Sequence, residues 1–153
     1  MFFRTERFFL QTNEIYATIC AMKTVHHRTC VFSIGYHIVF CTKYRRKVLV
    51  PRVEEALKAI VAATGAEKGF ETGAIEMGLD HVHMFVSAAP HVPISDLVKW
   101  IKGISARKLF VLFPELKKRM GDHLWNPSYY VGTVGDMSAD VVRRYIDGQE
   151  EKE

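Results

Sequence analysis

Hydrophobic and polar residues alternate in four segments of this chain, and this pattern predicts four β-strands. Successive side chains of a strand point to opposite faces, so the strand that begins at Asp80 should bury Val82, Met84 and Val86 on one face. The strongest strand signal is the first, which is rich in β-branched and aromatic residues. The predicted strands are 30–42, 70–77, 80–86 and 123–134.

Apolar residues at helical spacing predict three helices. Pro51 begins the first, because proline is common in the first helical turn. Ser95 is the expected N-terminal cap of the second helix, at 95–113, and Ser138 that of the last, at 139–149. The expected buried stripes are Val53, Ala56, Leu57, Ile60 and Val61 in the first helix, and Leu97, Val98, Ile101, Leu109 and Leu112 in the second.

The resulting order is β-α-β-β-α-β-α, and its first six elements match the split βαβ, ferredoxin-like pattern. This predicts an α+β fold with an antiparallel sheet and helices on one face. The length of 153 residues fits one domain, expected at 29–153. Residues 1–28 lack clear periodicity and are interpreted as an N-terminal extension, with Met22 a possible natural start.

Composition narrows the setting in which the protein works. No apolar run approaches the roughly 18 residues that a membrane helix needs. Cys20, Cys30 and Cys41 form an odd set without a Cys-x-x-Cys pair, which argues against a disulfide framework or a structural zinc site. These features favour a cytoplasmic protein.

The net charge of +4 is mild, but the basic residues are clustered. The segment Lys43–Lys47 carries four positive charges in five residues, and residues 93–120 hold seven basic residues against two acidic ones. Such clusters suggest a polyanionic partner, although a solvated charged face would look similar. In the second helix, Lys99 and Lys102 lie beside the small residues Gly103 and Ala106, which would let a phosphate backbone approach closely. The alternative is that Gly103 is merely a tolerated weak point in the helix.

Two pairs of residues are candidates for chemistry. His81 and His83 share one strand face, roughly 7 Å apart at their Cα atoms, and could converge on a divalent metal. The alternative is two polar residues on a solvated sheet face. Tyr145 and Gln149 form an i, i+4 pair, in which a tyrosine could attack a phosphodiester and an amide oxygen could bind a metal. A buried tyrosine is the alternative, because apolar residues share its helical face.

Five segments, in order, give the chain a family resemblance. They are Tyr36–Phe40 with Lys43–Lys47; Asp80–His83; Lys99–Arg107; Leu124–Tyr129; and Arg144–Ile146 with Gln149. From about residue 33 to 149 the chain resembles the single-tyrosine HUH transposases of the insertion-sequence 200/605 family, which are named for the triplet matching His81-Val82-His83.

The resemblance implies an enzyme that binds hairpins in single-stranded DNA and cuts and rejoins one strand. Tyr145 would form a 5′-phosphotyrosine link and free a 3′-hydroxyl. A divalent ion, Mg²⁺ or Mn²⁺, would sit on His81, His83 and Gln149. Such an enzyme would act in a prokaryotic cytoplasm, on the nucleoid.

The resemblance also implies a homodimer with joined sheets, in which the C-terminal catalytic helix of one subunit can complete the site of the other. Gly132 and Gly135 are then hinge candidates, against a simpler interpretation as glycines at a strand end. The expected DNA contacts are Lys43, Arg45, Arg46, Lys47, Lys99, Lys102 and Arg107.

Other functions remain open at this point. One is a related tyrosine transposase domesticated to process repetitive palindromes, and another is a metal-dependent nuclease that uses water and forms no adduct. A third is a non-catalytic ferredoxin-like module that binds nucleic acid. Such modules usually expose aromatic residues on their sheet, whereas this chain offers His81 and His83 there, which favours chemistry.

Overall fold

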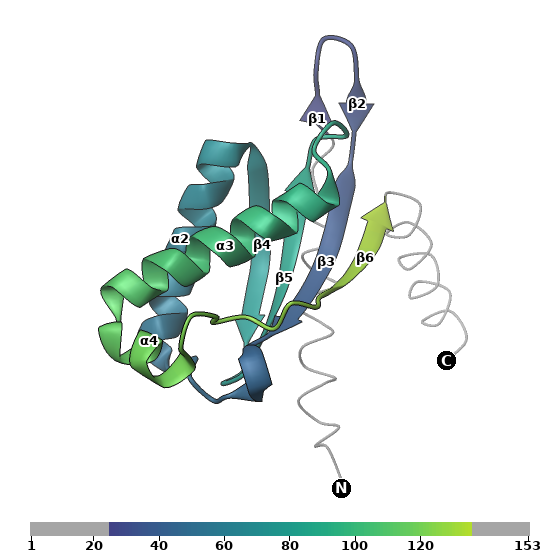
Figure 1. Ribbon diagram of the computed structural model, residues 1–153. Coiled ribbons are helices and arrows are strands. Elements are labelled where there is room, and N and C mark those ends of the chain that lie inside the picture. Colours follow the sequence, from purple (N-terminus) through teal and green to yellow (C-terminus); the bar gives the residue numbers. More distant parts are fainter. Residues whose placement is uncertain (1–24, 136–153) are drawn as a thin grey trace, which may run out of the picture.

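The computed structural model describes residues 25–135 (Figure 1). The proposed start at Met22, the predicted last helix at 139–149, and the candidates Tyr145 and Gln149 all lie outside the described residues. Within the described part, no helix is long and apolar enough to span a membrane.

A four-stranded antiparallel sheet forms the centre of the fold. Its strands are β3 (Ile34–Cys41), β4 (Phe70–Met77), β5 (His81–Ala88) and β6 (Tyr130–Gly135), in the order β4-β5-β3-β6. The two strands at the centre, β3 and β5, are those with the most apolar sequences. This topology confirms the predicted α+β, ferredoxin-like class.

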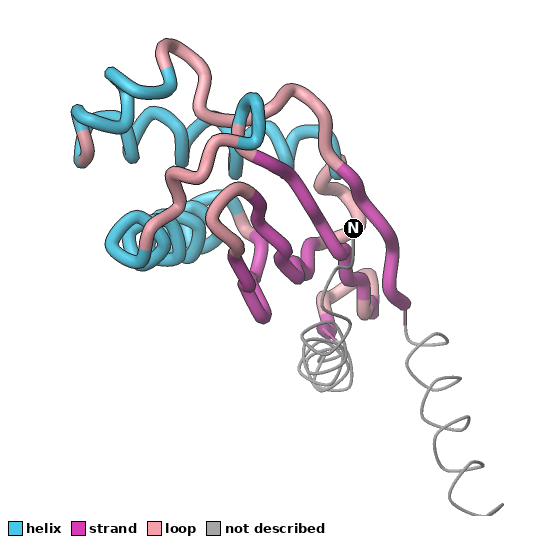
Figure 2. The backbone as a smooth tube through the Cα atoms, turned by 90° about the horizontal axis from the view of Figure 1, so that it is seen from below, coloured by secondary structure: helices cyan, strands magenta, loops and turns pink. Residues whose placement is uncertain are grey.

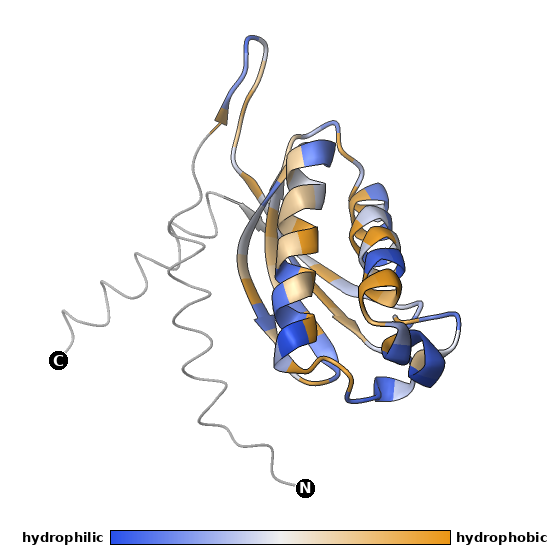
Figure 3. Cartoon of the chain, turned by 90° about the vertical axis from the view of Figure 1, so that its left-hand side faces the viewer, coloured by the Kyte–Doolittle hydropathy of each residue, from blue (hydrophilic) through white to orange (hydrophobic). Residues whose placement is uncertain are grey.

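Two long helices, α2 (Pro51–Lys68) and α3 (Ile94–Leu112), cover one face of the sheet (Figures 1 and 2). The core lies between these two layers, and hydrophobic positions recur along both helices (Figure 3). The helix α2 begins at Pro51 as predicted, and Gly69, with φ of 83°, ends it in the left-handed conformation that glycine adopts readily. The fully buried residues of the core include Ile38, Phe40, Val82, Met84, Leu57, Val61, Leu97, Ile101 and Leu109.

Two details predicted for α3 are wrong. Ser95 does not cap the helix, because the N-cap is Pro93, two residues earlier. The carbonyl of Pro93 accepts hydrogen bonds from the backbone N–H groups of Asp96 and Leu97, each at 3.1 Å. Leu112 is 58% exposed instead of buried, since it lies in the last turn of the helix. The position that completes the buried stripe is a serine, Ser105.

The ends of the predicted strands also need correction. The segment 30–42 is broken at Ser33, so Val31–Phe32 (β2) pairs with Val25–His26 (β1) in a separate small hairpin, which reaches into the segment interpreted as an extension. The strand predicted at 123–134 begins only at Tyr130, because the preceding segment instead runs past the end of β3. The short helix α4 (Pro114–Met120) was not predicted.

Candidate active site and nucleic-acid interface

The sheet face away from the helices carries the candidate metal ligands. The register of β3 against β5 sets His81 opposite Cys41 and His83 opposite Val39. Val82 and Met84, which alternate with the two histidines along β5, are buried on the helix side. The two histidines therefore share one face, as the alternation predicts.

Their imidazole rings lie next to each other and nearly perpendicular. The ring centroids of His81 and His83 are 5.3 Å apart, and their planes make an angle of 75°. Burial lowers the pKa of His83, and the positive charges of His81 and His37 lower it further. The neutral imidazole is the form that binds a metal, so this environment suits a ligand.

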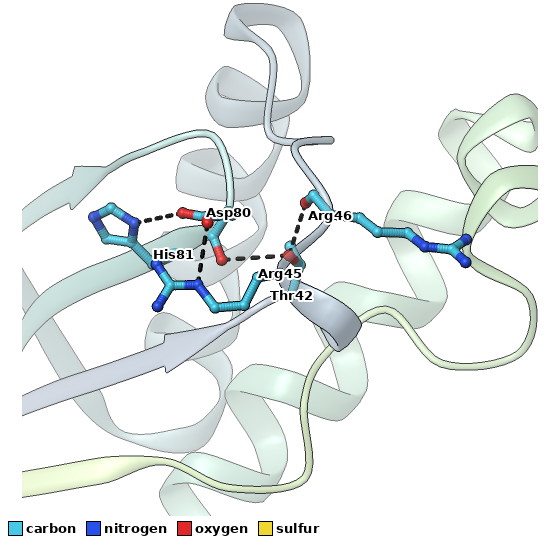
Figure 4. Close-up of polar contacts among 5 residues, drawn as sticks. All are labelled: Thr42, Arg45, Arg46, Asp80 and His81. Atoms are coloured by element: carbon cyan, nitrogen blue, oxygen red, sulfur yellow. Dashed lines mark hydrogen bonds and ion pairs between the residues drawn. The ribbon is translucent and has the colours of Figure 1, made fainter. Parts of the chain in front are cut away.

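Asp80 holds the first of these histidines in place (Figure 4). Its Oδ1 lies 2.8 Å from Nδ1 of His81, and its Oδ2 accepts a hydrogen bond of 3.1 Å from Nε of Arg45. Burial pushes the pKa of Asp80 upward, but the hydrogen bonds from His81 and Arg45 outweigh it, so the pKa lies below its usual value. An ionised carboxylate only accepts hydrogen bonds, which puts the proton of His81 on Nδ1 and leaves Nε2 to face a ligand.

The backbone at Asp80 is tied to the end of β3 through Thr42. The amide of Thr42 donates to the carbonyl of Asp80 at 2.9 Å. Oγ1 of the same residue lies 2.8 Å from the carbonyl oxygen of Arg46 and 3.3 Å from that of Asp80. Thr42 is fully buried, so these bonds fix the basic segment to the start of the His-x-His strand.

Two further residues shape this face, and sequence reasoning gave neither of them a role. His37 stacks on Phe85, with ring centroids 5.2 Å apart, and its ring centroid is 5.5 Å from that of His83. Burial lowers the pKa of His37, and its buried Nε2 has no hydrogen-bond partner in the described structure. Gly78 underlies His81, since a Cβ placed there would come within 2.3 Å of the ring carbon Cε1. The sequence signal that could have found His37 is the alternation of side chains along its strand, which places it on the same sheet face as His83.

The arrangement fits part of a metal site. Two adjacent imidazoles, one oriented by a carboxylate, are a common half of a divalent-metal donor set. Among residues 25–135, no group of three or more His, Cys, Asp and Glu side chains is arranged to hold a metal. A third ligand would have to come from elsewhere, and the predicted one, Gln149, lies outside the described residues.

The segment Lys43–Lys47 leaves β3 directly beside this site. Arg45 is engaged with Asp80, and the guanidinium of Arg46 points away from that carboxylate and donates to the carbonyl of Arg119 (Figure 4). Lys47 is exposed and Lys43 is half-buried. The four predicted DNA contacts are thus together on the surface, although two of them also make internal bonds.

The basic residues of α3 differ from one another. Lys99 and Arg107 are exposed. The ammonium of Lys102 instead donates to the carbonyls of Asn126, Pro127 and Ser128, at 2.5, 3.3 and 3.2 Å. Burial lowers the pKa of Lys102, and the residue holds the segment that leads into β6.

An open groove of about 450 Å³ lies between α3 and the segment 122–127, and it is also lined by Lys43 of the basic segment. The residues of α3 that line it are Lys102, Gly103 and Ala106. A Cβ at Gly103 would meet no atom within 4 Å, so the groove is open at this point of the helix. This geometry would permit a phosphate backbone of DNA to approach the helix closely, as the sequence suggested.

The two hinge candidates lie in the edge strand. Gly132 pairs with His37 inside β6, and Gly135 is the last residue of that strand, opposite Ile34. A Cβ at Gly132 would be 3.0 Å from the hydroxyl of Tyr130. The segment that such a hinge would move, from residue 136 onward, lies outside the described residues.

Comparison with known proteins identifies the family. The sequence matches the family described as "Transposase IS200 like" over residues 30–149. The chain belongs to this transposase family. It is 42% identical over 127 residues to the ISDra2 transposase TnpA of Deinococcus radiodurans, covering 82% of this chain and 91% of that protein. The transposase for insertion sequence element IS200 of Salmonella typhimurium is 33% identical over 119 residues, covering 77% of this chain and 78% of the relative.

Solved structures agree with this assignment. A crystal structure of a transposase from Deinococcus radiodurans R1 superposes with a TM-score of 0.68 at 40% identity, covering 82% of this chain and 97% of that one. A REP-associated tyrosine transposase bound to a REP hairpin has a TM-score of 0.52 at 15% identity, covering 82% and 69%, and it shares the fold. The predicted transposase family is confirmed.

Proposed function

We propose that this transposase cuts and rejoins one strand of DNA by metal-assisted transesterification, with Tyr145 as the nucleophile. The observation that carries the proposal is the pair His81 and His83 on an open sheet face, the first of them oriented by Asp80. A divalent metal, Mg²⁺ or Mn²⁺, bound there would polarise the scissile phosphate. Gln149 is the proposed third ligand.

The proposed chemistry exchanges one phosphate ester for another, so the energy of the broken phosphodiester bond is kept for rejoining. The Tyr145 hydroxyl gives up its proton as its oxygen attacks the phosphorus and the bond from phosphorus to the 3′ oxygen breaks. The 3′ oxygen takes up a proton and leaves as a 3′-hydroxyl. The tyrosine is left with a 5′-phosphate ester, and a second strand end can reverse the step. Hydrolysis by water would form no bond between protein and DNA, so a covalent protein–DNA adduct distinguishes transesterification from hydrolysis.

The proposed substrate is single-stranded DNA that folds into hairpins at the ends of the element. The REP-associated transposase of the same fold was solved with a REP hairpin, so a hairpin is the ligand to test first. Lys43, Arg45, Arg46, Lys47, Lys99 and Arg107 would contact phosphates, which position a strand without reading its sequence. Lys102 is assigned to holding its own loop.

The proposed assembly is a homodimer joined through its sheets. The strand β6 is terminal in the described sheet, and a terminal strand is a ready template for pairing with another chain. Gly132 and Gly135 would then allow the segment after β6 to place Tyr145 on either subunit.

The test is incubation of the protein with single-stranded DNA from the ends of its encoding element and Mn²⁺ or Mg²⁺, followed by a denaturing gel. We expect a protein–DNA band that disappears in Tyr145→Phe, while hairpin binding is retained. Tyr129→Phe is a matched control that should nick normally, since the Tyr129 ring, which lies 5.7 Å from Nζ of Lys102, is preserved. Wild-type nicking by Tyr145→Phe would rule out this nucleophile, and nicking without an adduct would favour a hydrolytic nuclease.

A further inference from the structure

Tyr44 is a large aromatic residue that the fold displays at the surface. Its side chain is 74% exposed, although tyrosine usually buries much of its ring. It lies at the centre of the basic segment Lys43–Lys47, in the turn that follows β3. Its exposure is therefore combined with the densest positive charge of the sequence.

The backbone at this point adopts a conformation that side chains disfavour. Tyr44 has φ of 57° and Arg45 has φ of 51°, and these are the two non-glycine residues with positive φ in the described structure. Residues in this region persist only where their surroundings hold them, and they concentrate at functional sites. Here the surroundings act on both sides of the turn, since the amide of Lys43 donates to the carbonyl of Leu124 at 2.9 Å and the amide of Arg45 donates to that of Thr42 at 3.0 Å.

Two cations lie over the Tyr44 ring, and the residue is still largely exposed. Nζ of Lys43 is 5.3 Å and Cζ of Arg46 is 5.7 Å from the ring centroid. An exposed ring beside cations has the two parts of a site for single-stranded nucleic acid, a stacking surface for a base and positive charge for the adjoining phosphates. A contact made to phosphates alone would not require an aromatic residue.

We propose that Tyr44 is a stacking platform for one unpaired base of the DNA, with Lys43 and Arg46 neutralising the phosphates beside that base. This rests on the proposed function in so far as it requires that the protein bind single-stranded DNA. The next residue, Arg45, bonds to the carboxylate that orients His81, so the stacked base would be anchored to the element that carries the metal ligands.

The test compares Tyr44→Leu with Tyr44→Phe by fluorescence anisotropy, using labelled single-stranded DNA from the element ends with a hairpin and its unpaired flanks. Leucine keeps a Cβ and so retains the same backbone constraint, whereas phenylalanine keeps the ring. We expect Tyr44→Leu to weaken binding about 5- to 150-fold, the range for loss of one stacked base, and Tyr44→Phe to bind like the wild type. The slope of log affinity against log salt should not change, because no phosphate contact is lost.

Single abasic sites along the unpaired flanks locate the stacked base. One abasic position should weaken binding to the wild type and have no further effect on Tyr44→Leu. Equal affinity of Tyr44→Leu and wild type, or an abasic penalty that is the same in both, would overturn the platform while leaving nicking by the wild type intact. Failure of the wild type to bind this DNA at all would overturn the proposed function as well.

Discussion

Asp80 Oδ1 lies 2.8 Å from Nδ1 of His81, so the residue before the His-x-His triplet fixes the orientation of its first histidine. The other oxygen of the same carboxylate accepts a bond from Arg45 in the basic segment. One side chain thus joins the candidate metal ligand to the candidate DNA-binding segment. A metal-ligating histidine commonly has such an acceptor on its second nitrogen.

Replacing this carboxylate should weaken metal binding. Asp80→Asn keeps the size of the side chain but removes the charge that selects the tautomer of His81. We expect Mn²⁺ affinity, measured by calorimetry on the full chain, to fall about 10- to 100-fold. The control Glu55→Gln removes a similar charge from an exposed position of α2 and should leave the affinity unchanged. Equal Mn²⁺ affinity of Asp80→Asn and wild type would show that Asp80 does not orient a ligand.

Two glycine-to-alanine substitutions should affect different properties, the first metal affinity and the second stability. In Gly78→Ala the new Cβ would meet the His81 ring at 2.3 Å, so the imidazole must move and Mn²⁺ affinity should fall at least about tenfold. In Gly103→Ala the Cβ would meet nothing within 4 Å, and the better helix former should raise stability by about 0.5–1 kcal/mol without affecting the metal. Calorimetry and thermal unfolding of both variants provide the check. Unchanged Mn²⁺ binding by Gly78→Ala would contradict the placement of His81.

The fold could be predicted because its elements are long and periodic. The strands of the sheet alternate, α2 and α3 have clear stripes, and their order alone leads to the ferredoxin-like class. The helix α4 was missed because its seven residues, Pro114–Met120, are too few to establish a period. The cap at Ser95 was assigned wrongly because residue preference does not reveal where a chain turns, and Pro93 turned it earlier.

The site could be predicted only in part. Strand parity places His81 and His83 together from the sequence alone. The bond from Arg45 to Asp80 joins residues 35 positions apart, and it depends on the pairing of β3 with β5, which no local pattern encodes. Similarly, a cluster of basic residues does not distinguish an exposed lysine such as Lys99 from Lys102, whose ammonium donates to carbonyls inside the fold.

This difference between the two lysines can be measured. Lys99→Ala should reduce the slope of log DNA affinity against log salt by about 1, the value for one phosphate contact, since an exposed lysine can neutralise a phosphate. Lys102→Ala should leave that slope unchanged and lower stability by about 1 kcal/mol, because three carbonyls lose their shared donor while the cost of burying the charge is also removed. Salt titrations of anisotropy and denaturant unfolding give the two quantities. A reduced slope in Lys102→Ala would place its ammonium on the DNA instead.

Two serines of α3 test the packing beneath the groove. Ser105 is fully buried, and its Oγ accepts a hydrogen bond of 3.0 Å from the indole N–H of Trp125, which in turn packs edge-on against Phe40. Ser105→Ala leaves that buried donor without a partner, so the free energy of unfolding should fall by about 1–3 kcal/mol.

The matched control is Ser95→Ala, at the exposed position that does not cap the helix. Because no capping bond is lost and alanine is the better helix former, its stability should equal or slightly exceed that of the wild type. Urea unfolding followed by circular dichroism measures both variants under one condition. A loss of about 1 kcal/mol in Ser95→Ala would restore Ser95 as the cap, and an unchanged Ser105→Ala would mean that water can satisfy Trp125 in place of the serine.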